Sequence, residues 1–295
     1  MQNTCINITG KLPLGLIGIY ADISEHAKEL AIDFLVVGAM ARDMVLVHGY
    51  GSTIERGTRD VDFGINVGSW NEFNVLRDRL LKAGYKSDIH RIHRLTCVDS
   101  EGHPWEIDIV PFGEIAGDNN SINWPPGQGF VMNVLGFSEA FEHALSVQIS
   151  EDPDIVIPVA SPAGICLLKL VSWLDREVEL RAKDATDFEY LIKSYSKIPE
   201  INDALFEDGY MEAQEWDEAK SSVMKLGEDV GKIASVVTMA FLEEKLFNLP
   251  NRKEQFARDM QSQAGSDLAE YTEKLNIFAK AVSAGYVNRR LKVTS

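Results

Sequence analysis

The fold is decided by residues 34–67, FLVVGAMARDMVLVHGYGSTIERGTRDVDFGINV. Residues 34–37 form an apolar run that predicts a short buried strand ending at Gly38. Residues 40–47 then have helical character. Gly38 and Ala39 are small enough to let the backbone approach a ligand, and the following helix N-terminus would offer free N–H groups to an anion. A strand–glycine–helix turn alone is weak evidence, because many α/β proteins have one for packing reasons.

Two carboxylates come at the end of this stretch. Residues 60–67 alternate strictly between apolar and polar or small residues, which predicts a strand with Asp60 and Asp62 on one face. Two such charges repel each other, and a divalent cation between them is the usual resolution. Ligands that are all oxygen favour Mg²⁺ or Mn²⁺ over zinc.

A third carboxylate follows on a second predicted strand, residues 105–112. Asp108 shares one face of this strand with Glu106 and Val110, and a buried acid needs a partner or a metal. An acid-x-acid pair is common by chance in so acidic a chain. The combination of the glycine turn, the acidic pair and the third acid is typical of a two-metal phosphoryl-transfer site.

Composition limits the class of protein. The chain has 295 residues, 45% hydrophobic and 25% charged, as in soluble globular proteins, and no apolar run is long enough to predict a membrane-spanning helix. Its three widely spaced cysteines argue for a reducing compartment and against a disulfide framework or a zinc site, so we expect a cytoplasmic protein. With a net charge of -16, an RNA substrate would need a local basic patch.

Weaker patterns predict the remaining elements. Residues 21–33 have helical spacing, and residues 69–83 predict an amphipathic helix that opens with a capping box. Residues 117–130 are rich in Gly, Pro and Asn and predict a surface loop, whereas residues 138–147 predict a helix. Residues 151–158 are the best candidate for a domain junction.

The C-terminal half has a helical pattern from Ser161 onward, so we expect two domains, residues 1–158 and 159–295. Lys169 lies among leucines on the first of these helices, and such lysines commonly extend outward to solvent. Lys183 and Asp187 are four residues apart on the next helix, which is the spacing of a surface ion pair.

Together these motifs resemble the nucleotidyltransferase superfamily that includes DNA polymerase beta. The resemblance rests on GAMARD (38–43), RDVDF (59–63) and EIDIVPFG (106–113). Within the superfamily the chain is similar to the AbiEii toxin type of minimal nucleotidyltransferase, whose helical C-terminal half carries a lysine motif and then K/R-D-x-x-D. KLVS from Lys169 and RAKDATD (181–187) match that pattern.

The resemblance covers about residues 30–195 and implies an α+β fold. We expect a polymerase beta-like mixed sheet with flanking helices, followed by a helical C-terminal half. It also implies roles for the residues of the motifs. Asp60 and Asp62 would hold Mg²⁺ or Mn²⁺ bound to the triphosphate, and Asp108 would bridge to the second metal and help deprotonate the attacking hydroxyl. Gly38 and Ala39 would cradle phosphate oxygens.

Further roles follow from the helical motifs and from two arginines. Lys169 would neutralise triphosphate charge, and Lys183 and Asp187 would orient the nucleotide or Lys169. Arg42 and Arg59 are candidates for phosphate contacts, but a structural salt bridge is an equal alternative, for example to the neighbouring aspartate at position 43.

One departure from the family pattern lies at the glycine turn. The superfamily usually has Gly-Gly or Gly-Ser where this chain has Gly38-Ala39. Alanine keeps the backbone small but removes a hydroxyl donor to the nucleotide phosphates, although backbone N–H groups could still bind.

The resemblance implies an enzyme that moves a nucleoside monophosphate from an NTP to an acceptor hydroxyl and releases pyrophosphate. The acceptor could be tRNA or another RNA, a protein side chain or a small molecule. In the AbiEii-type interpretation the protein is a toxin with an antitoxin partner. An RNA acceptor would need several arginines to gather into a basic patch, namely Arg56, Arg59, Arg91, Arg94, Arg289 and Arg290.

Two alternatives use the same fold or the same acids. The protein could be a catalytically silent nucleotide-binding or regulatory module, which the missing Gly-Ser supports and the three retained carboxylates oppose. It could also be a metal-dependent phosphohydrolase, but such sites usually carry metal-ligand histidines. The six histidines of this chain do not form a recognisable cluster.

Overall fold

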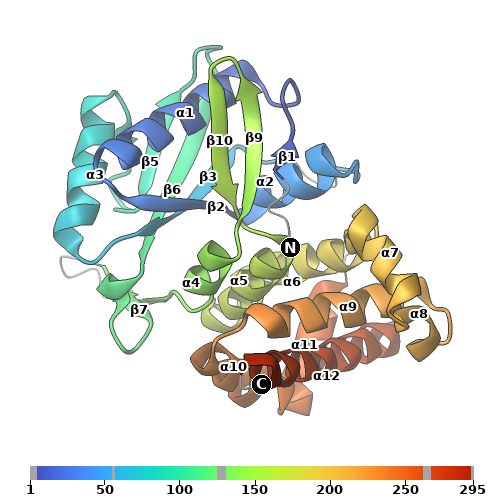
Figure 1. Cartoon of the computed structure of the whole chain (residues 1–295). Helices are drawn as coiled ribbons and strands as arrows, with labels where there is room; N and C mark the ends of the chain where they lie inside the picture. The colour runs from blue at the N-terminus through green and yellow to red at the C-terminus, as the bar shows by residue number, and fades with distance from the viewer. Residues whose placement is uncertain (1–4, 55–56, 125–130, 262–266, 294–295) are drawn as a thin grey trace. The chain divides into compact units, whose positions relative to one another are not determined.

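The computed structural model describes residues 5–54, 57–124, 131–261 and 267–293 (Figure 1). The chain divides into two compact units, Met1–Ser161 and Pro162–Ser295. Residues 151–158, expected as a junction, instead contribute most of strand β10 (Asp154–Val159), which belongs to the sheet of the first unit. The boundary between the two units therefore lies after the last strand of this sheet.

The first unit is built on a mixed sheet, as the sequence predicts. In spatial order, the eight strands of the described residues are β1 (Ile6–Asn7), β9 (Leu145–Glu151), β10 (Asp154–Val159), β2 (Asp33–Val37), β3 (Asp60–Asn66), β6 (Pro104–Phe112), β5 (Arg94–Val98) and β4 (Lys86–Ser87). The pairs β1–β9, β10–β2 and β3–β6 are parallel, and the other neighbours are antiparallel.

Two helices of the first unit, α1 (Leu14–Glu29) and α3 (Trp70–Lys82), pack beside the sheet (Figure 1). Helix α1 contacts β3 through Tyr20 and Phe63, whose rings are 5.8 Å apart. It begins before the predicted residue 21 because buried apolar residues already recur from its first turn onward. The predicted N-cap of α3 is confirmed, since Ser69 Oγ accepts a hydrogen bond from the Glu72 N–H at 3.4 Å, and the Glu72 carboxylate accepts from the Gly68 N–H instead of the Ser69 N–H.

The predicted helix after the glycine turn has two parts. Helix α2 (Gly38–Arg42) follows β2 directly, and a π-helical segment, η1 (Asp43–Gly49), continues it. Most residues of both parts are buried, so this helical segment belongs to the core of the first unit.

Two predictions for residues 117–147 are wrong in part. The expected loop contains β7 (Ser121–Asn123), which pairs with β8 (Val131–Asn133), while residues 125–130 lie outside the described residues. A short 3-10 helix, η2 (Glu114–Ala116), precedes them. The expected helix 138–147 ends early, because α4 (Phe137–Glu142) gives way to β9, whose buried residues alternate as in a strand.

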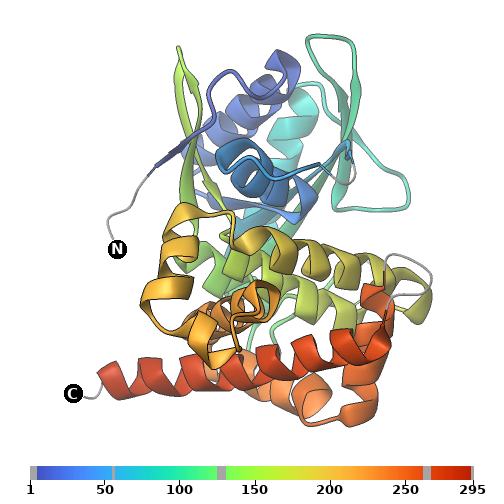
Figure 2. The same ribbon diagram turned by 90° about the vertical axis from the view of Figure 1, so that its right-hand side faces the viewer.

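The second unit is helical, as expected. Its elements are α5 (Pro162–Asp175), α6 (Val178–Tyr195), α7 (Pro199–Glu207), α8 (Tyr210–Ala213), α9 (Glu218–Ile233), α10 (Val236–Leu242), η3 (Glu243–Phe247), α11 (Pro250–Met260) and α12 (Leu268–Val293). An aromatic core joins them, in which Phe188 contacts Phe256 and Phe278 edge to face, with ring centroids 5.2 and 4.9 Å apart. The long α12 lies along this unit (Figure 2).

Helices α9 and α12 touch backbone to backbone. A Cβ atom added to Gly231 of α9 would lie 2.1 Å from the Val282 carbonyl oxygen, and one added to Gly285 of α12 would lie 2.1 Å from the Glu228 carbonyl oxygen. Only glycine allows this approach. The two glycines therefore fix how closely the two helices pack.

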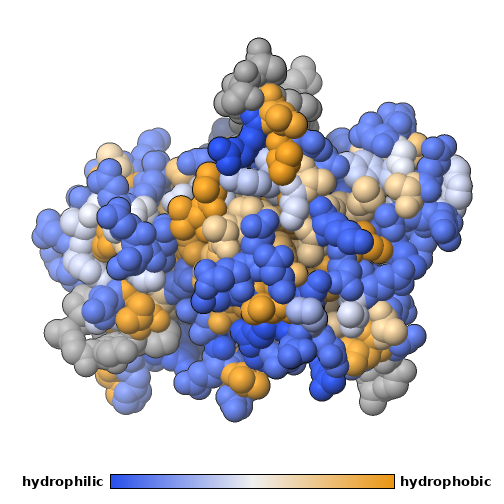
Figure 3. All heavy atoms as spheres, turned by 90° about the horizontal axis from the view of Figure 1, so that it is seen from below, coloured by the Kyte–Doolittle hydropathy of each residue, from blue (hydrophilic) through white to orange (hydrophobic). Residues whose placement is uncertain are grey.

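In the part of the chain that the structure describes, no helix is both long and apolar enough to cross a bilayer. On the face shown in Figure 3, hydrophilic residues predominate and hydrophobic ones lie singly or in small groups among them.

Candidate active site

Four carboxylates lie together on one face of the sheet in the first unit. The parallel register of β3 and β6 places Asp60 opposite Glu106 and Asp62 opposite Asp108. Directly opposed residues share a face, and neighbouring strands are about 4.8 Å apart. The structure thus brings together the three predicted acids. We call Asp60, Asp62, Glu106 and Asp108 the carboxylate block; sequence reasoning had noted Glu106 on this face but gave it no role.

Gly38 makes room for the carboxylate of Asp62. The β2–β3 register pairs Val37 with Asp62, so the glycine turn follows directly beside this acid. Gly38 has a φ of 72°, and a Cβ atom added to it would lie 2.0 Å from Asp62 Oδ2. The glycine therefore has a steric role toward Asp62, in addition to the phosphate cradle expected from the sequence. The next residue, Ala39, is buried at the start of α2.

Asp108 is held by an arginine that sequence reasoning considered only for an RNA patch. Arg94 on β5 lies opposite Asp108, and its Nε and Nη2 donate to Oδ1 and Oδ2 at 2.7 Å each. Arg94 Nη1 also pairs with Glu106. The hydrogen bonds to Asp108 are the main reason that the pKa of Arg94 is raised. A bidentate pair of this kind is among the stronger polar contacts in proteins.

A buried tyrosine lies near Asp62. Tyr20 is fully buried, and within the described residues its hydroxyl has no hydrogen-bond partner. Burial raises its pKa, and the carboxylates of Asp62 and then Asp43 raise it further. This side chain is therefore an uncharged neighbour of Asp62, one member of the carboxylate block.

The two arginines of the glycine-turn and RDVDF motifs differ in environment. Arg42 is buried, and its Nε donates to Asp43 Oδ1 at 2.9 Å, so it takes part in the structural salt bridge that was one of the two expected alternatives. Arg59 is exposed, and its backbone carbonyl accepts a hydrogen bond from Glu106 N–H at 3.2 Å.

Lys169 belongs to the second unit, where it lies between two aspartates of α6. Its Nζ is 2.6 Å from Asp187 Oδ2 and 3.1 Å from Asp184 Oδ1, and its side chain is 12% exposed. The lysine therefore does not extend into solvent. Burial lowers its pKa, but the two carboxylates outweigh burial and the pKa is raised. Sequence reasoning gave Asp184 no part in this contact, although it lies one turn before Asp187 on the same helix face.

The expected ion pair between Lys183 and Asp187 does not form. Asp187 contacts Lys169 instead, and the ammonium of Lys183 is exposed and makes no ion pair within the described ranges. Arg176 Nη1 lies 3.3 Å from Asp184 Oδ2, so this buried carboxylate has two cationic neighbours.

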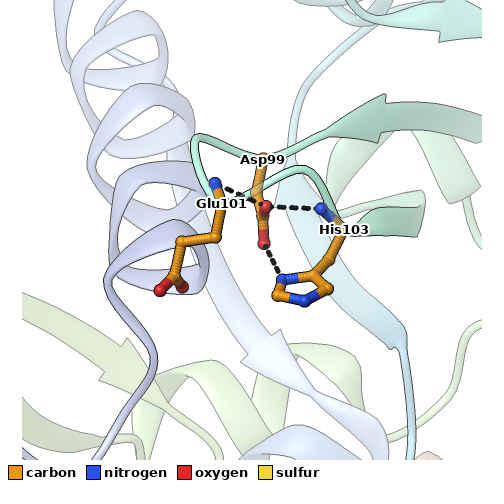
Figure 4. A group of neighbouring side chains, drawn as sticks. All are labelled: Asp99, Glu101 and His103. Carbon is orange, nitrogen blue, oxygen red and sulfur yellow. Dashed lines mark hydrogen bonds and ion pairs between the residues drawn. The ribbon is translucent and has the colours of Figure 1, made fainter.

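A second group of possible metal ligands lies in the turn between β5 and β6. One ligand atom from each of Asp99, Glu101 and His103 lies within 4.8 Å of the others (Figure 4). Asp99 Oδ1 already accepts the N–H groups of Glu101 and His103, and its Oδ2 accepts the Trp105 indole N–H at 2.7 Å. Glu101 Oε2 accepts the N–H of Gly15, in the first turn of α1.

This turn serves as the cap of helix α1. The helix begins after Pro13, which offers no side-chain cap, and it has no acidic residue in its first turn. The carboxylate of Glu101 supplies the missing acceptor from another part of the chain. The hydrogen bonds of Asp99 and Glu101 thus explain the acidic turn without a metal ion.

The carboxylate block offers a different donor set for a divalent cation, although among the described residues only the 99–103 turn brings three ligand atoms within 4.8 Å of one another. Its donor atoms are all carboxylate oxygens, as Mg²⁺ and Mn²⁺ prefer. Arg94 pairs with two of the four carboxylates, those of Glu106 and Asp108. Asp60 and Asp62 are half-buried, so these side chains are partly accessible from solvent.

Comparison with known proteins assigns the chain to a family. The family model described as nucleotidyl transferase AbiEii toxin, type IV TA system, matches residues 24–281. The chain belongs to the AbiEii nucleotidyltransferase family. It is therefore a nucleotidyltransferase, an enzyme that moves a nucleoside monophosphate from an NTP, as the resemblance of its motifs predicted. The fold prediction, a polymerase beta-like mixed sheet followed by a helical half, is likewise confirmed.

Several solved structures are similar to this AbiEii-family chain. The lincosamide antibiotic adenylyltransferase LnuA, bound to lincomycin, is 19% identical, with a TM-score of 0.36, covering 63% of this chain and 97% of its own. The antibiotic-resistance factor ANT(2'')-Ia is 12% identical, with a TM-score of 0.33, covering 68% and 95%. The CCA-adding enzyme of Thermotoga maritima, complexed with tRNA, is 11% identical, with a TM-score of 0.26, covering 98% and 85%. No curated protein sequence matched the chain.

Proposed function

We propose that this AbiEii-family enzyme transfers a nucleoside monophosphate to a hydroxyl of an RNA, such as tRNA, in a reaction that requires Mg²⁺ or Mn²⁺. The observation that carries the proposal is the carboxylate block, in which Asp60, Asp62 and Asp108 lie on one face of two adjacent strands. Oxygen ligands in this arrangement are typical of metal-assisted phosphoryl transfer.

The three predicted acids and the glycine turn each have a part in this reaction. Asp60 and Asp62 would hold the cation, which neutralises charge on the triphosphate and on the leaving pyrophosphate. Asp108 would accept the proton of the attacking hydroxyl as a general base. Backbone N–H groups at Gly38 and Ala39 would bind phosphate oxygens, because the helical segment that begins there points its free N–H groups outward from its first turn.

The helical motifs contribute through Lys169. In this proposal Lys169 neutralises triphosphate charge, a role that rests on the family motif at residues 169–172. Asp187 and Asp184 hold its ammonium in one position. Lys183, exposed and unpaired within the described ranges, is left to contact the nucleotide.

Two of the arginines expected for an RNA acceptor are exposed on the unit that carries the carboxylate block. Arg59 and Arg91 are exposed and make no ion pair with the described residues. Arg94 pairs with Asp108, and Arg289 donates to the carbonyls of Lys232 and Ala234. Arg56 lies outside the described residues. We expect RNA binding to weaken as the salt concentration rises, because phosphate contacts release counterions; a flat salt dependence would exclude this acceptor.

The biological role that we propose is that of a cytoplasmic toxin neutralised by an antitoxin protein. The description of the family supports it, since it names a toxin of a type IV toxin–antitoxin system. Growth arrest on expression of the wild-type chain, absent for Asp60→Asn, is the expected result. Equal growth arrest by both proteins would show that toxicity does not come from nucleotidyl transfer.

The direct test is release of pyrophosphate from each NTP in the presence of Mg²⁺ and total cellular RNA. Asp60→Asn and Asp62→Asn should lower the rate about a thousandfold or more, because each removes a ligand worth several kcal/mol to the transition state. Asp78→Asn is the matched control, since Asp78 is an exposed acid on α3. Full activity of both Asp60 and Asp62 variants would refute the site.

A further inference from the structure

The pairing of Arg94 with Asp108 bears on how a second cation could bind. Both oxygens of the Asp108 carboxylate accept hydrogen bonds from the same guanidinium, at 2.7 Å each, and both side chains are only 15% exposed. A divalent cation at Asp108 would need these same oxygens. It would also lie close to a fixed positive charge that repels it.

The third contact of Arg94 shows where the guanidinium could go. Its Nη1 already pairs with Glu106, whose side chain is 47% exposed and therefore has room to move. Release of Asp108 would break two hydrogen bonds of Arg94 and leave this one in place. Glu106 and Asp108 share a face of β6, so the movement between them is short.

We propose that Arg94 is an exchangeable counter-ion of the carboxylate block. It holds Asp108 while the site has no second cation, and it moves onto Glu106 when that cation binds. Arg94 and Glu106 are thus positioning residues for Asp108. This inference rests on the proposed metal-dependent function, and it adds a control over when Asp108 becomes a metal ligand.

The inference predicts opposite effects for the two partners. Arg94→Gln removes the competitor, so a second ion should bind about tenfold or more tightly, as expected when a hydrogen bond to a charged group no longer competes. Glu106→Gln removes the alternative partner of Arg94, so the second ion should bind several-fold more weakly. In the double variant Arg94→Gln/Glu106→Gln, the weakening of second-ion binding by Glu106→Gln should disappear, because Glu106 acts through Arg94.

The measurement is a titration with Mn²⁺, read by electron paramagnetic resonance and calorimetry, with and without a non-hydrolysable α,β-methylene ATP. Arg79→Gln and Glu29→Gln are matched controls, because these residues form an exposed ion pair in the same unit. Arg94→Lys provides a second variant if Arg94→Gln unfolds. It keeps the charge but cannot bind both oxygens at once, so its second-ion affinity should be intermediate.

The outcomes separate this inference from the proposed function. Tighter second-ion binding in Arg94→Gln, with the loss of coupling in the double variant, supports the exchange. If the second ion binds Arg94→Gln equally or more weakly, while Asp60→Asn still abolishes binding of the first ion, the exchange is overturned and the proposed function stays intact. Absence of Mn²⁺ binding in the wild-type protein and in every variant, with the nucleotide present, would refute the proposed function itself.

Discussion

Replacement of Gly38 by alanine tests whether this glycine is required by the Asp62 carboxylate. The new Cβ would lie 2.0 Å from Oδ2 of Asp62, 2.8 Å from its Cγ and 3.1 Å from its Cβ. Contacts below 3.0 Å cannot persist, so either the carboxylate or the turn must move. The backbone at residue 38 also has a φ of 72°, which is strained for any residue with a Cβ atom.

The expected cost has two parts. A left-handed conformation costs an alanine about 1–2 kcal/mol, and overpacking a tight contact costs about 1–3 kcal/mol more. We expect Gly38→Ala to lower the free energy of unfolding by about 2–5 kcal/mol. At about 2–4 °C per kcal/mol, the melting temperature should fall by roughly 4–20 °C. A displacement of Asp62 by about 1 Å should lower kcat about a hundredfold.

Thermal unfolding and Mg²⁺-dependent pyrophosphate release measure the two effects. Gly18→Ala is the matched control, because Gly18 lies on exposed helix surface with nothing within 4 Å of an added Cβ, and it should be neutral or slightly stabilising. Adding Asp62→Ala to Gly38→Ala removes the carboxylate that the new Cβ would meet. The double variant should therefore regain the stability lost to this clash, but it should regain no activity. If Gly38→Ala keeps wild-type stability and activity, the close approach of Asp62 has no consequence and the reasoning fails.

Two further predictions concern the helical unit. Gly231→Ala should lower its unfolding free energy by about 1–3 kcal/mol, measured by denaturant titration, because the new Cβ would meet the Val282 carbonyl oxygen at 2.1 Å; an unchanged midpoint would show that α9 and α12 can separate freely. Lys169→Met should cost about 3–5 kcal/mol because it removes the ammonium that pairs with both Asp184 and Asp187, and Asp187→Asn should recover part of it. The pKa of Lys169 is raised above 10.5, so the stability that its charged form contributes is fully present below pH 10.5 and is lost as the pH rises through the folded-state pKa. When the free energy of unfolding is measured between pH 9 and about 12, the wild-type protein should lose this stability and the Lys169→Met protein should not.

The sequence predicted the features that depend on local pattern. Alternation alone placed Asp60 and Asp62 on one face of β3, and the apolar run with Gly38 located the turn beside them. To predict that Asp108 lies on a neighbouring strand, the family motif was needed in addition, because alternation does not reveal which strands pair. The helical C-terminal half followed from periodicity over its whole length.

Contacts between distant segments could not be predicted in this way. Arg94 meets Asp108 only because β5 lies beside β6 in the sheet, and no local pattern specifies that order. Glu101 caps α1 from a turn 86 residues away in sequence. The strand β9 was mistaken for a helix because its apolar residues follow α4 without a Gly or Pro between them.

The order of strands in the sheet has a consequence for synthesis of the chain. Strands β3 and β6 pair residues 46 positions apart (Asp62 with Asp108), whereas β10 pairs with β2 across 123 positions (Val159 with Val36). At about 5–20 residues per second, the ribosome would release the acid-bearing strands several seconds before the strand that covers β2. A nascent chain that stops between residues 112 and 154 would carry the whole carboxylate block beside an open strand edge, where pairing with other chains begins.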